Sequence, residues 1–411
     1  MSELARRIWW LPVAAVAVAA PLSLTGFWLQ TGLFVMAAVI GAIGLTLLVG
    51  VAGQLSLAHA FFVATGAYGY AFLAGTGDDR VAGAGWPPPL AAVGAVALAA
   101  LAGALFSPIA GRLRGIYLGL ASLGLVFLGQ HVLRNATGLT GGFNGRDAAP
   151  FEAFGFSFTA TDPDLVVFGV PYGPLERLWY LGLLFVLVAG WYAVNLLRGR
   201  PGRALAGLRD SETAAAVLGV DVRRYRAAAF TVSSAYAGLA GVLLALSFGR
   251  IVPDSFGFGM SVDFLAMVVI GGSGSVPGAA AGAVLVTALP LILGRYSDAV
   301  PFLAQPGEPG IGAAEAARLL YGAAVVAVLL FAPGGLAGLA RRLRPARAPR
   351  PTRAPRFTRA PTPAPAPTPA PSPRPATEEP HHDPTTTDPH DSDLPLPRRD
   401  RPDRVREGDL G

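Results

Sequence analysis

Residues 197–226 read LRGRPGRALAGLRDSETAAAVLGVDVRRYR, a charged segment between two long hydrophobic stretches. Seven arginines frame it, with Asp210, Ser211 and Glu212 near its centre. Ser211 or Asp210 can cap the N-terminus of a short helix, and Glu212 suits the positive end of the helix dipole. Gly219 supplies a C-terminal stop. The pattern predicts a short helix from Glu212 to just before Gly219 on which another protein docks, with an ordinary solvated loop as the alternative.

Hydrophobic residues make up 53% of the chain and charged residues only 14%. Because crossing a bilayer takes about 20 apolar residues, the long apolar stretches before residue 345 predict an all-α polytopic membrane protein with about ten transmembrane helices. We place these spans at 8–24, 32–50, 56–75, 89–110, 115–133, 177–196, 227–249, 261–275, 277–294 and 318–338. The polar start of the third span (53–60) and the glycine-rich junction at 271–277 are the two places where the sequence leaves open whether a helix breaks.

Arginine alone supplies the basic charge, because all 32 Lys and Arg positions are Arg. If the N-terminus is cytoplasmic, alternation of the spans places most arginines inside, namely Arg6, Arg7, Arg112, Arg114, the seven of the charged segment, Arg341, Arg342 and Arg344. Most acidic residues of the membrane region then fall outside. This distribution follows the positive-inside rule, so the charged segment and both termini are predicted to be cytoplasmic. We interpret span 8–24 as an uncleaved anchor rather than a cleaved signal, since a polytopic chain needs its first span to set topology.

The composition changes abruptly at about Pro345, where Pro, Arg, Thr and Ala take over. Such a segment cannot bury a core. We therefore divide the chain into a transmembrane domain, residues 1–344, and a disordered cytoplasmic tail, residues 345–411. The arginines of the tail either lie on anionic lipid headgroups or have no selected role.

Two residue types are missing, and each absence excludes a chemistry. The chain has no cysteine, which excludes disulfides and thiolate catalysis. It has no lysine, so it cannot form the GxxxxGK[ST] loop that holds nucleotide phosphates. If the chain transports with ATP, a separate ATPase must dock on it, and the charged segment is where we expect that contact. We expect no catalytic residue, no metal site and no cofactor in the chain itself.

Five blocks of sequence carry a resemblance to a known family. They are GLTLLVGVAGQLSLAHAFFVATGAYGYAFL at 44–73, TGGFNG at 140–145, GRALAGLRDSETAAAVLGVDVRRYRAAAFTVSSAYAGLAGVLLA at 202–245, MSVDFLAMVVIGGSGSVPGAAAGAVLV at 260–286 and LLYGAAVVAVLLFAPGGLAGL at 319–339. In this order they resemble the permease subunits of branched-chain amino acid ABC importers, the LivM type. The chain departs from the family at Phe143, Ala216 and Asp263, where the family more often has a small residue, an acidic residue and Glu, and in its tail.

The resemblance implies a channel-forming subunit in a prokaryotic plasma (inner) membrane. It implies a homologous second permease, two cytoplasmic ATP-binding-cassette ATPases that bind the ATP, and an extracytoplasmic substrate-binding protein as partners, with membrane lipid around them and no nucleic acid. Branched-chain or other hydrophobic amino acids are the implied cargo. Urea or short amides, which related permeases carry, are the alternative.

Three groups of residues are candidates for the site. The resemblance identifies 197–226 as the coupling segment, whose predicted contacts with the ATPases are Arg209, Asp210, Glu212, Ala214, Ala215 and Gly219. The predicted external loop contains Thr140, Gly141, Gly142, Asn144 and Gly145. The predicted translocation path contains Gly53, Gln54, Ser56, His59, Asp263, Gly271 and Gly272. We expect an alternating-access mechanism in which the spans around 53–69 and 261–285 open or close the path.

The polar members of the path group have a second interpretation. Polar side chains at the start of an apolar span are costly unless they face partners or water. Gln54, Ser56 and His59 therefore either line the path or cap helices and bond neighbouring helices. Asp263, near the outer end of its span, is either a gate residue or a residue at the membrane boundary.

Two other classes of protein fit the sequence less well. A membrane enzyme needs paired carboxylates, a metal cluster or a nucleophile with its base, and His59, His131 and Asp263 lack a spacing that suggests a joint site. An ion-coupled secondary transporter needs acidic residues in mid-span, for which Asp263 is a marginal candidate.

Overall fold

The computed structural model describes residues 10–77, 81–113, 115–159, 165–167, 170–296, 312–331 and 334–342. The chain divides into two units, Met1–Ala346 and Arg347–Gly411, and every described residue belongs to the first. The predicted tail therefore lies outside the described residues.

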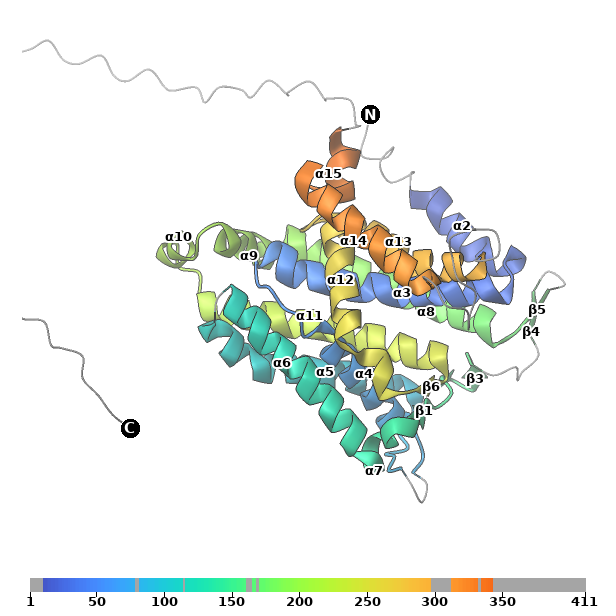
Figure 1. Cartoon of the computed structure of the whole chain (residues 1–411). Helices are drawn as coiled ribbons and strands as arrows, with labels where there is room; N and C mark the ends of the chain where they lie inside the picture. The colour runs from blue at the N-terminus through green and yellow to red at the C-terminus, as the bar shows by residue number, and fades with distance from the viewer. Residues whose placement is uncertain are drawn as a thin grey trace, which may run out of the picture. The chain divides into compact units, whose positions relative to one another are not determined.

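Each of the ten predicted spans contains a helix, which confirms the all-α polytopic fold (Figure 1). These helices are α2 (Trp10–Ser23), α3 (Gly26–Leu45), α4 (His59–Ala74), α5 (Pro88–Arg112), α6 (Ile116–Asn135), α8 (Pro174–Arg198), α11 (Val222–Phe248), α12 (Phe258–Gly271), α13 (Val276–Arg295) and α14 (Ala313–Phe331). Shorter helices are α7 (Thr137–Thr140), α9 (Arg200–Asp210), α10 (Glu212–Val217) and α15 (Gly335–Arg342). Among the described residues, six helices are long and apolar enough to cross a membrane, counting α3 together with the turn that follows it. α4 and α12 are shorter, with 16 and 14 residues.

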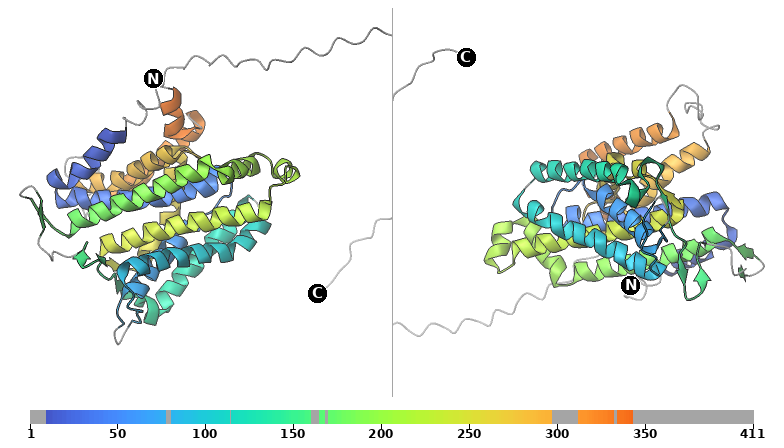
Figure 2. Two further views of the ribbon diagram at one scale, coloured as in Figure 1. Left: turned by 180° about the vertical axis from the view of Figure 1, so that it is seen from behind. Right: turned by 90° about the horizontal axis from the view of Figure 1, so that it is seen from below.

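The core of the bundle is formed by α3 and α11. Their apolar windows are 83% and 78% buried, against 28% for α6 and 22% for α8. Figure 2 shows α11 running between α5 and α6 on one side and α3 and α8 on the other. A helix that is apolar all round must be buried, whereas α6 and α8 keep apolar faces that suit lipid or a partner helix.

The polar start of the third predicted span is not helical, so α4 is shorter than the span. α3 continues into a π-helical turn, η1 (Thr46–Val51), and α4 begins only at His59. Between them lies irregular backbone at residues 52–58, the polar linker. Its amide at Leu57 donates to the Ser122 hydroxyl of α6 over 2.8 Å. Irregular backbone at membrane depth persists only where protein or water forms hydrogen bonds with its polar groups. Here α6 provides one of these hydrogen bonds.

The glycine-rich junction at 271–277 is a tight hairpin between α12 and α13. The turn residues Gly272 and Gly274 have φ values of +100° and +87°, which residues other than glycine rarely adopt. The Ser275 hydroxyl caps α13 by accepting a hydrogen bond from the Gly278 amide over 3.3 Å. A Cβ on Gly271 would lie 2.2 Å from the Gly278 carbonyl oxygen, so the two helices meet backbone to backbone.

Short antiparallel strand pairs occur in the loops. β1 (Arg146–Asp147) pairs with β6 (Arg250–Ile251), β2 (Glu152–Ala153) with β3 (Phe156–Ser157), and β4 (Leu165–Val167) with β5 (Val170–Tyr172). Two 3-10 turns, η2 (Gly142–Asn144) and η3 (Pro253–Phe256), lie in the same loops. In Figure 1, β1 and β6 lie at the opposite end of the bundle from α10.

Loops predicted to share a side of the membrane contact one another. On the predicted outer side, the Ala82 amide donates to the Gly138 carbonyl over 2.8 Å, and Arg134 pairs with Asp254 at 2.6 Å. On the predicted inner side, the Arg226 guanidinium donates to the Gly111 carbonyl over 3.4 Å. The contacts therefore agree with the alternation of the spans.

Candidate functional site

The coupling segment forms two helices rather than one. The first, α9, was not predicted, because its four charged side chains concealed a helical pattern. Its buried residues are Gly202, Leu205 and Leu208, and Leu205 and Leu208 are three positions apart. This spacing places them on one face of a helix and was the signal that could have revealed α9.

The second helix, α10, is the predicted short helix. It ends at Val217, one residue earlier than expected. The Ser211 hydroxyl accepts a hydrogen bond from the Ala214 amide over 3.2 Å, so Ser211 is the cap rather than Asp210. At the other end, Gly219 has a φ of +82°, and the amides of Gly219 and Val220 close the helix onto the carbonyls of Ala216 and Ala215. This is the Schellman arrangement, in which glycine is favoured.

α10 leaves an apolar tip exposed. Val217 and Leu218 are each 83% exposed, whereas Ala215 is buried against the rest of the chain. Of the two alanines predicted to contact a partner, Ala214 is exposed and Ala215 is not. Two large apolar side chains that protrude together from a charged segment are candidates for contact with another protein.

An ion pair fixes α10 to the bundle. The Glu212 carboxylate pairs with the Arg226 guanidinium of α11, and the Arg226 side chain is only 13% exposed. Arg226 also reaches the C-terminal end of α5 through the Gly111 carbonyl. Because removing one partner of a shielded pair leaves the other charge without a counter-charge, this contact ties α10 to two long helices. Asp210, by contrast, is exposed.

Arg209 brings the coupling residues and the path residues together. Its guanidinium donates to the Gly50 carbonyl at the end of η1. A Cβ on Gly53 would lie 3.1 Å from the Cγ of Arg209, so the arginine stem covers the start of the polar linker. The sequence placed Arg209 and Gly53 in different groups, and folding makes them neighbours.

The polar side chains of the path group are buried. Gln54 is 5% exposed, and Ser56 and His59 are each 2% exposed. Ser56 accepts a hydrogen bond from the Ala58 amide over 3.3 Å, which fits the capping interpretation. Within the described residues, both polar atoms of the Gln54 amide and the Nε2 of His59 lack a hydrogen-bond partner. Buried polar atoms of this kind require water or a ligand.

His59 and Asp263 are not brought to a common site. The His59 ring packs on Phe264 of α12, with centroids 4.6 Å apart. Asp263 instead accepts a hydrogen bond from the Tyr321 hydroxyl of α14 over 2.5 Å. Adjacent residues of a helix point about 100° apart, so α12 presents Phe264 to His59 of α4 and Asp263 to Tyr321 of α14. Gly271 and Gly272 lie in the α12–α13 hairpin, where a Cβ on Gly272 would be 2.3 Å from the Gly334 carbonyl oxygen.

The external loop is a tight glycine turn. Gly141, Gly142 and Gly145 have φ values of +74°, +60° and +70°. A Cβ on Gly145 would lie 2.0 Å from the Ile251 carbonyl oxygen, so β6 approaches this backbone directly. Thr140 is buried, and its hydroxyl accepts a hydrogen bond from the Gly142 amide over 3.1 Å. Glycine is therefore required here by both the turn and the close approach.

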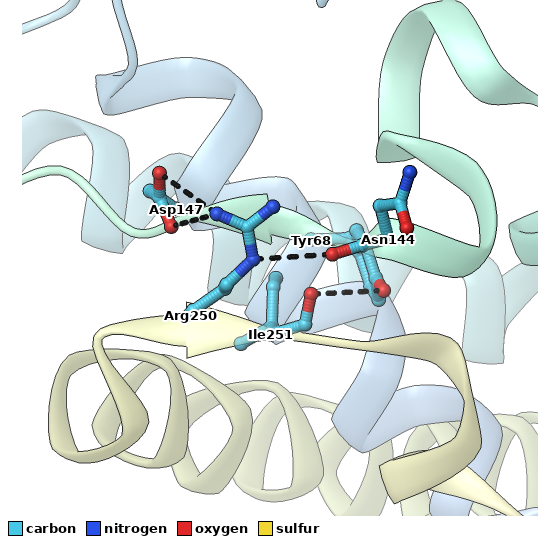
Figure 3. Close-up of polar contacts among 5 residues, drawn as sticks. All are labelled: Tyr68, Asn144, Asp147, Arg250 and Ile251. Carbon is cyan, nitrogen blue, oxygen red and sulfur yellow. Dashed lines mark hydrogen bonds and ion pairs between the residues drawn. The ribbon is translucent and has the colours of Figure 1, made fainter.

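Arginines that sequence reasoning did not select organise the same loop (Figure 3). Arg250 donates to the Asn144 carbonyl over 3.1 Å and to the Asp147 carboxylate over 3.0 Å. The Tyr68 hydroxyl of α4 donates to the Ile251 carbonyl over 3.5 Å. Arg146 is 6% exposed and donates to the Leu139 carbonyl over 2.5 Å. Their signal was the presence of arginine on the acid-rich side of the membrane.

A polar cavity of about 850 Å³ opens at this end of the bundle. Thr76 after α4, Asn144 of the external loop and the charged side chains of Arg146, Asp147 and Arg250 contribute to its lining. A second cavity, of about 710 Å³, lies between α5, α8 and the β2–β3 hairpin and has an apolar lining that includes Phe151 and Phe185. The polar cavity suits a small charged solute, and the apolar one faces the lipid-exposed helices.

An apolar helical bundle contains a buried polar linker, a polar cavity at one end and a short helix with an exposed apolar tip at the other. These features define a multi-pass membrane transport protein.

Comparison with known proteins defines the family. Residues 8–329 match the family described as "Branched-chain amino acid transport system / permease component", and the chain belongs to it. The chain is 33% identical over 350 residues to the high-affinity branched-chain amino acid transport system permease protein LivM of Escherichia coli K12, covering 83% of this chain and 77% of that protein. LivH of the same organism is 28% identical over 264 residues, covering 59% and 77%. The autoinducer 2 import permease LsrC of Enterobacter sp. 638 is 34% identical over 117 residues, covering 27% and 33%. No solved structure matches the chain. The resemblance seen in the sequence is confirmed.

Proposed function

We propose that this chain forms the translocation path of an ATP-driven importer for branched-chain amino acids in a prokaryotic inner membrane. The LivM relative is a permease of a branched-chain amino acid transport system and covers most of the chain, which supports this cargo. Similarity to both LivM and LivH supports pairing with a second, homologous permease. Two separate ATPases and an extracytoplasmic binding protein complete the proposed assembly.

The observation that carries the proposal is the physical connection between α10 and the polar linker. α10 exposes Val217 and Leu218 for an ATPase, and α9 reaches the linker through Arg209. With α10 at the cytoplasmic face, both termini lie in the cytoplasm and the polar cavity opens outside. ATP binding then closes the ATPase dimer, and α9 and α10 move together as a rigid lever.

The unsatisfied atoms of Gln54 and His59 mark the path in this proposal. Burying polar atoms without hydrogen-bond partners inside a membrane protein costs free energy, so such atoms are retained where water or a polar solute passes. The spans around 53–69 and 261–285 open or close this path. Asp263, Gly271 and Gly272 act at the second of these segments, through the contacts of α12 with α14 and α13.

Transport by the reconstituted assembly tests the proposal. Labelled leucine, isoleucine and valine are offered to vesicles that contain this chain with its co-encoded permease, ATPases and binding protein, and urea is offered in parallel. We expect ATP-dependent uptake of the three amino acids that stops when any one subunit is omitted. Uptake of urea alone would change the cargo, and uptake without an ATPase would overturn the proposed mechanism.

Variants of α10 test the docking assignment in the same vesicles. Glu212→Gln removes the ion pair with Arg226, and Gly219→Val removes the left-handed turn that ends the helix. Each is expected to abolish uptake while the protein still inserts. Arg223→Gln, at an exposed position of the same segment, is the matched control. Normal uptake by both α10 variants would contradict the assignment.

A further inference from the structure

Three segments that are distant in sequence converge on one arginine. The end of η1, the end of α9 and the α12–α13 turn meet at Gly50, Arg209 and Gly274. A Cβ on Gly50 would lie 2.4 Å from the Gly274 nitrogen, so these backbones are in direct contact. A Cβ on Gly274 would lie 3.9 Å from the Nη1 of Arg209. The arginine side chain therefore lies where the end of η1 and the α12–α13 turn meet.

The π-helical turn makes the Gly50 carbonyl available. In an α-helix, the Gln54 amide would bond to this carbonyl, but here it donates to the Leu48 carbonyl over 3.1 Å. The Arg209 guanidinium takes the vacated position. A cation is favoured there because the last carbonyls of a helix carry partial negative charge.

Glycines shape the space that the arginine stem occupies. Gly53 has a φ of +68°, and a Cβ there would lie 3.1 Å from the Cγ of Arg209. Gly274 also has a positive φ, at +87°. The side chain thus packs against the polar linker along its stem and bonds to η1 at its tip. No other α9 arginine is recorded with such a long-range contact in the described residues, and Arg203 donates to the neighbouring Arg198 carbonyl.

We propose that Arg209 is the positioning residue that makes α9 and the polar linker move as one body, so that a displacement of the docking helix reaches Gln54 and His59. The inference rests on the proposed function and assigns the transmission step to one side chain. In this proposal Arg209 acts through the Gly50 carbonyl, in place of the direct contact with an ATPase that the sequence predicted for it. Without it, α9 and η1 lose the one long-range side-chain hydrogen bond recorded between them in the described part of the chain.

Uncoupling of ATP hydrolysis from transport is the first test. In the complete importer, Arg209→Gln is compared with Arg203→Gln, which removes the same charge from the same helix. We expect Arg209→Gln to lower uptake at least ten-fold and to lose the stimulation of ATP hydrolysis by loaded binding protein. Basal hydrolysis and co-purification of the ATPases should remain, and Arg209→Lys, which keeps the charge, should restore part of the stimulation.

Three results would overturn the inference. Equal transport by the Arg209→Gln and Arg203→Gln variants would show that the contact transmits nothing. Loss of assembly and basal hydrolysis together in the Arg209→Gln variant would show that the arginine only supports the structure. Failure of Arg209→Lys to restore any stimulation would contradict a role for its charge. If the unmodified importer shows no ATP-dependent uptake, the proposed function itself fails.

A disulfide provides a second test, because the natural chain contains no cysteine. A Cβ on Gly53 would lie 3.5 Å from the Cβ of Arg209, within the range of about 3.5–4.5 Å that disulfides span. In the Gly53→Cys/Arg209→Cys variant, oxidation replaces the arginine contact with a covalent one. We expect the oxidised importer to show more stimulation by binding protein than the reduced one, with Gly53→Cys alone as the control. Equal or lower stimulation after oxidation, or failure of the pair to cross-link, would contradict the proposal.

Discussion

The two ends of the bundle, which the arginine distribution predicts to be the outer and the inner end, are held in different ways. At the outer end, β1 pairs with β6, and buried Arg146 bonds to the carbonyls of Ala82 and Leu139. At the inner end, α9 and α10 bury a few apolar side chains, including Leu205 and Leu208, and their polar attachments are two arginine side chains, Arg226 and Arg209. A network of backbone contacts resists displacement, whereas helices attached through long side chains can move as units. The outer end is therefore suited to a fixed platform and the inner end to a lever.

The largest effect is expected from the backbone contact at the outer end. Gly145→Ala should destabilise the protein by about 2–5 kcal/mol. Alanine is strained in the left-handed backbone conformation of this position, and its Cβ would clash with the Ile251 carbonyl. Gly138→Ala, where a Cβ meets nothing within 4 Å, is the control. Thermal unfolding of the purified protein in detergent measures the difference. Equal unfolding temperatures would show that the outer end is not held by this contact.

A smaller effect, on association, is expected at the tip of the inner end. Leu218→Asp should weaken binding of the ATPase by about 2 kcal/mol, roughly thirty-fold, because an exposed apolar anchor is lost. Phe143→Asp, the equivalent change at an exposed side chain of the outer end, should leave that binding unchanged. The measurement is the amount of ATPase that co-purifies with each variant. Equal loss in both variants would remove the distinction between the two ends.

The helix cap of α10 should contribute about 1 kcal/mol. Ser211→Ala removes the acceptor of the Ala214 amide, which leaves that donor without its cap. Hydrogen exchange of the Ala214 amide should become roughly five-fold faster, while exchange in the core helix α11 stays the same. Thr213→Ala, which removes a hydroxyl within the same helix, should not accelerate it. Unchanged exchange in the Ser211→Ala variant would show that α10 does not depend on its cap.

The smallest effect is expected for the exposed ion pair at the outer end. The side chains of Arg250 and Asp147 are 55% and 73% exposed, so water screens their attraction. A double-mutant cycle with Arg250→Gln and Asp147→Asn should give a coupling energy below about 1 kcal/mol. Unfolding of the two single variants and the double variant measures it. A larger coupling would mean that this pair, and not the backbone, holds the platform.

Much of the fold was predictable because it depends on local properties of the chain. The length of each apolar stretch predicted a helix, and the structure has a helix in all ten. The cap at Ser211 and the stop at Gly219 involve only neighbouring residues, so α10 was predictable to within one residue. The exact helix ends were less accurate, and α3 begins at Gly26 rather than at residue 32.

The candidate site was predictable in part. Gln54 and His59 were identified because polar side chains are rare at the start of an apolar span. Pairing of Asp263 with Tyr321 was not predictable, since the partner lies 58 residues away on another helix. The arginines of the outer end were missed because nothing local distinguishes Arg146, which is buried, from Arg250, which is exposed.

The sequence by itself determined the class of protein, the approximate positions of the long apolar helices and the uneven distribution of arginine from which their orientation is predicted. Hydrophobic length and charge act residue by residue along the chain, so they can be evaluated without a partner. Only the tertiary structure decided that Arg209 meets Gly50 and that Gly274 approaches the same point. Such contacts depend on how helices separated by many residues pack together, which is why the connection between the docking helix and the polar linker became visible only in the folded chain.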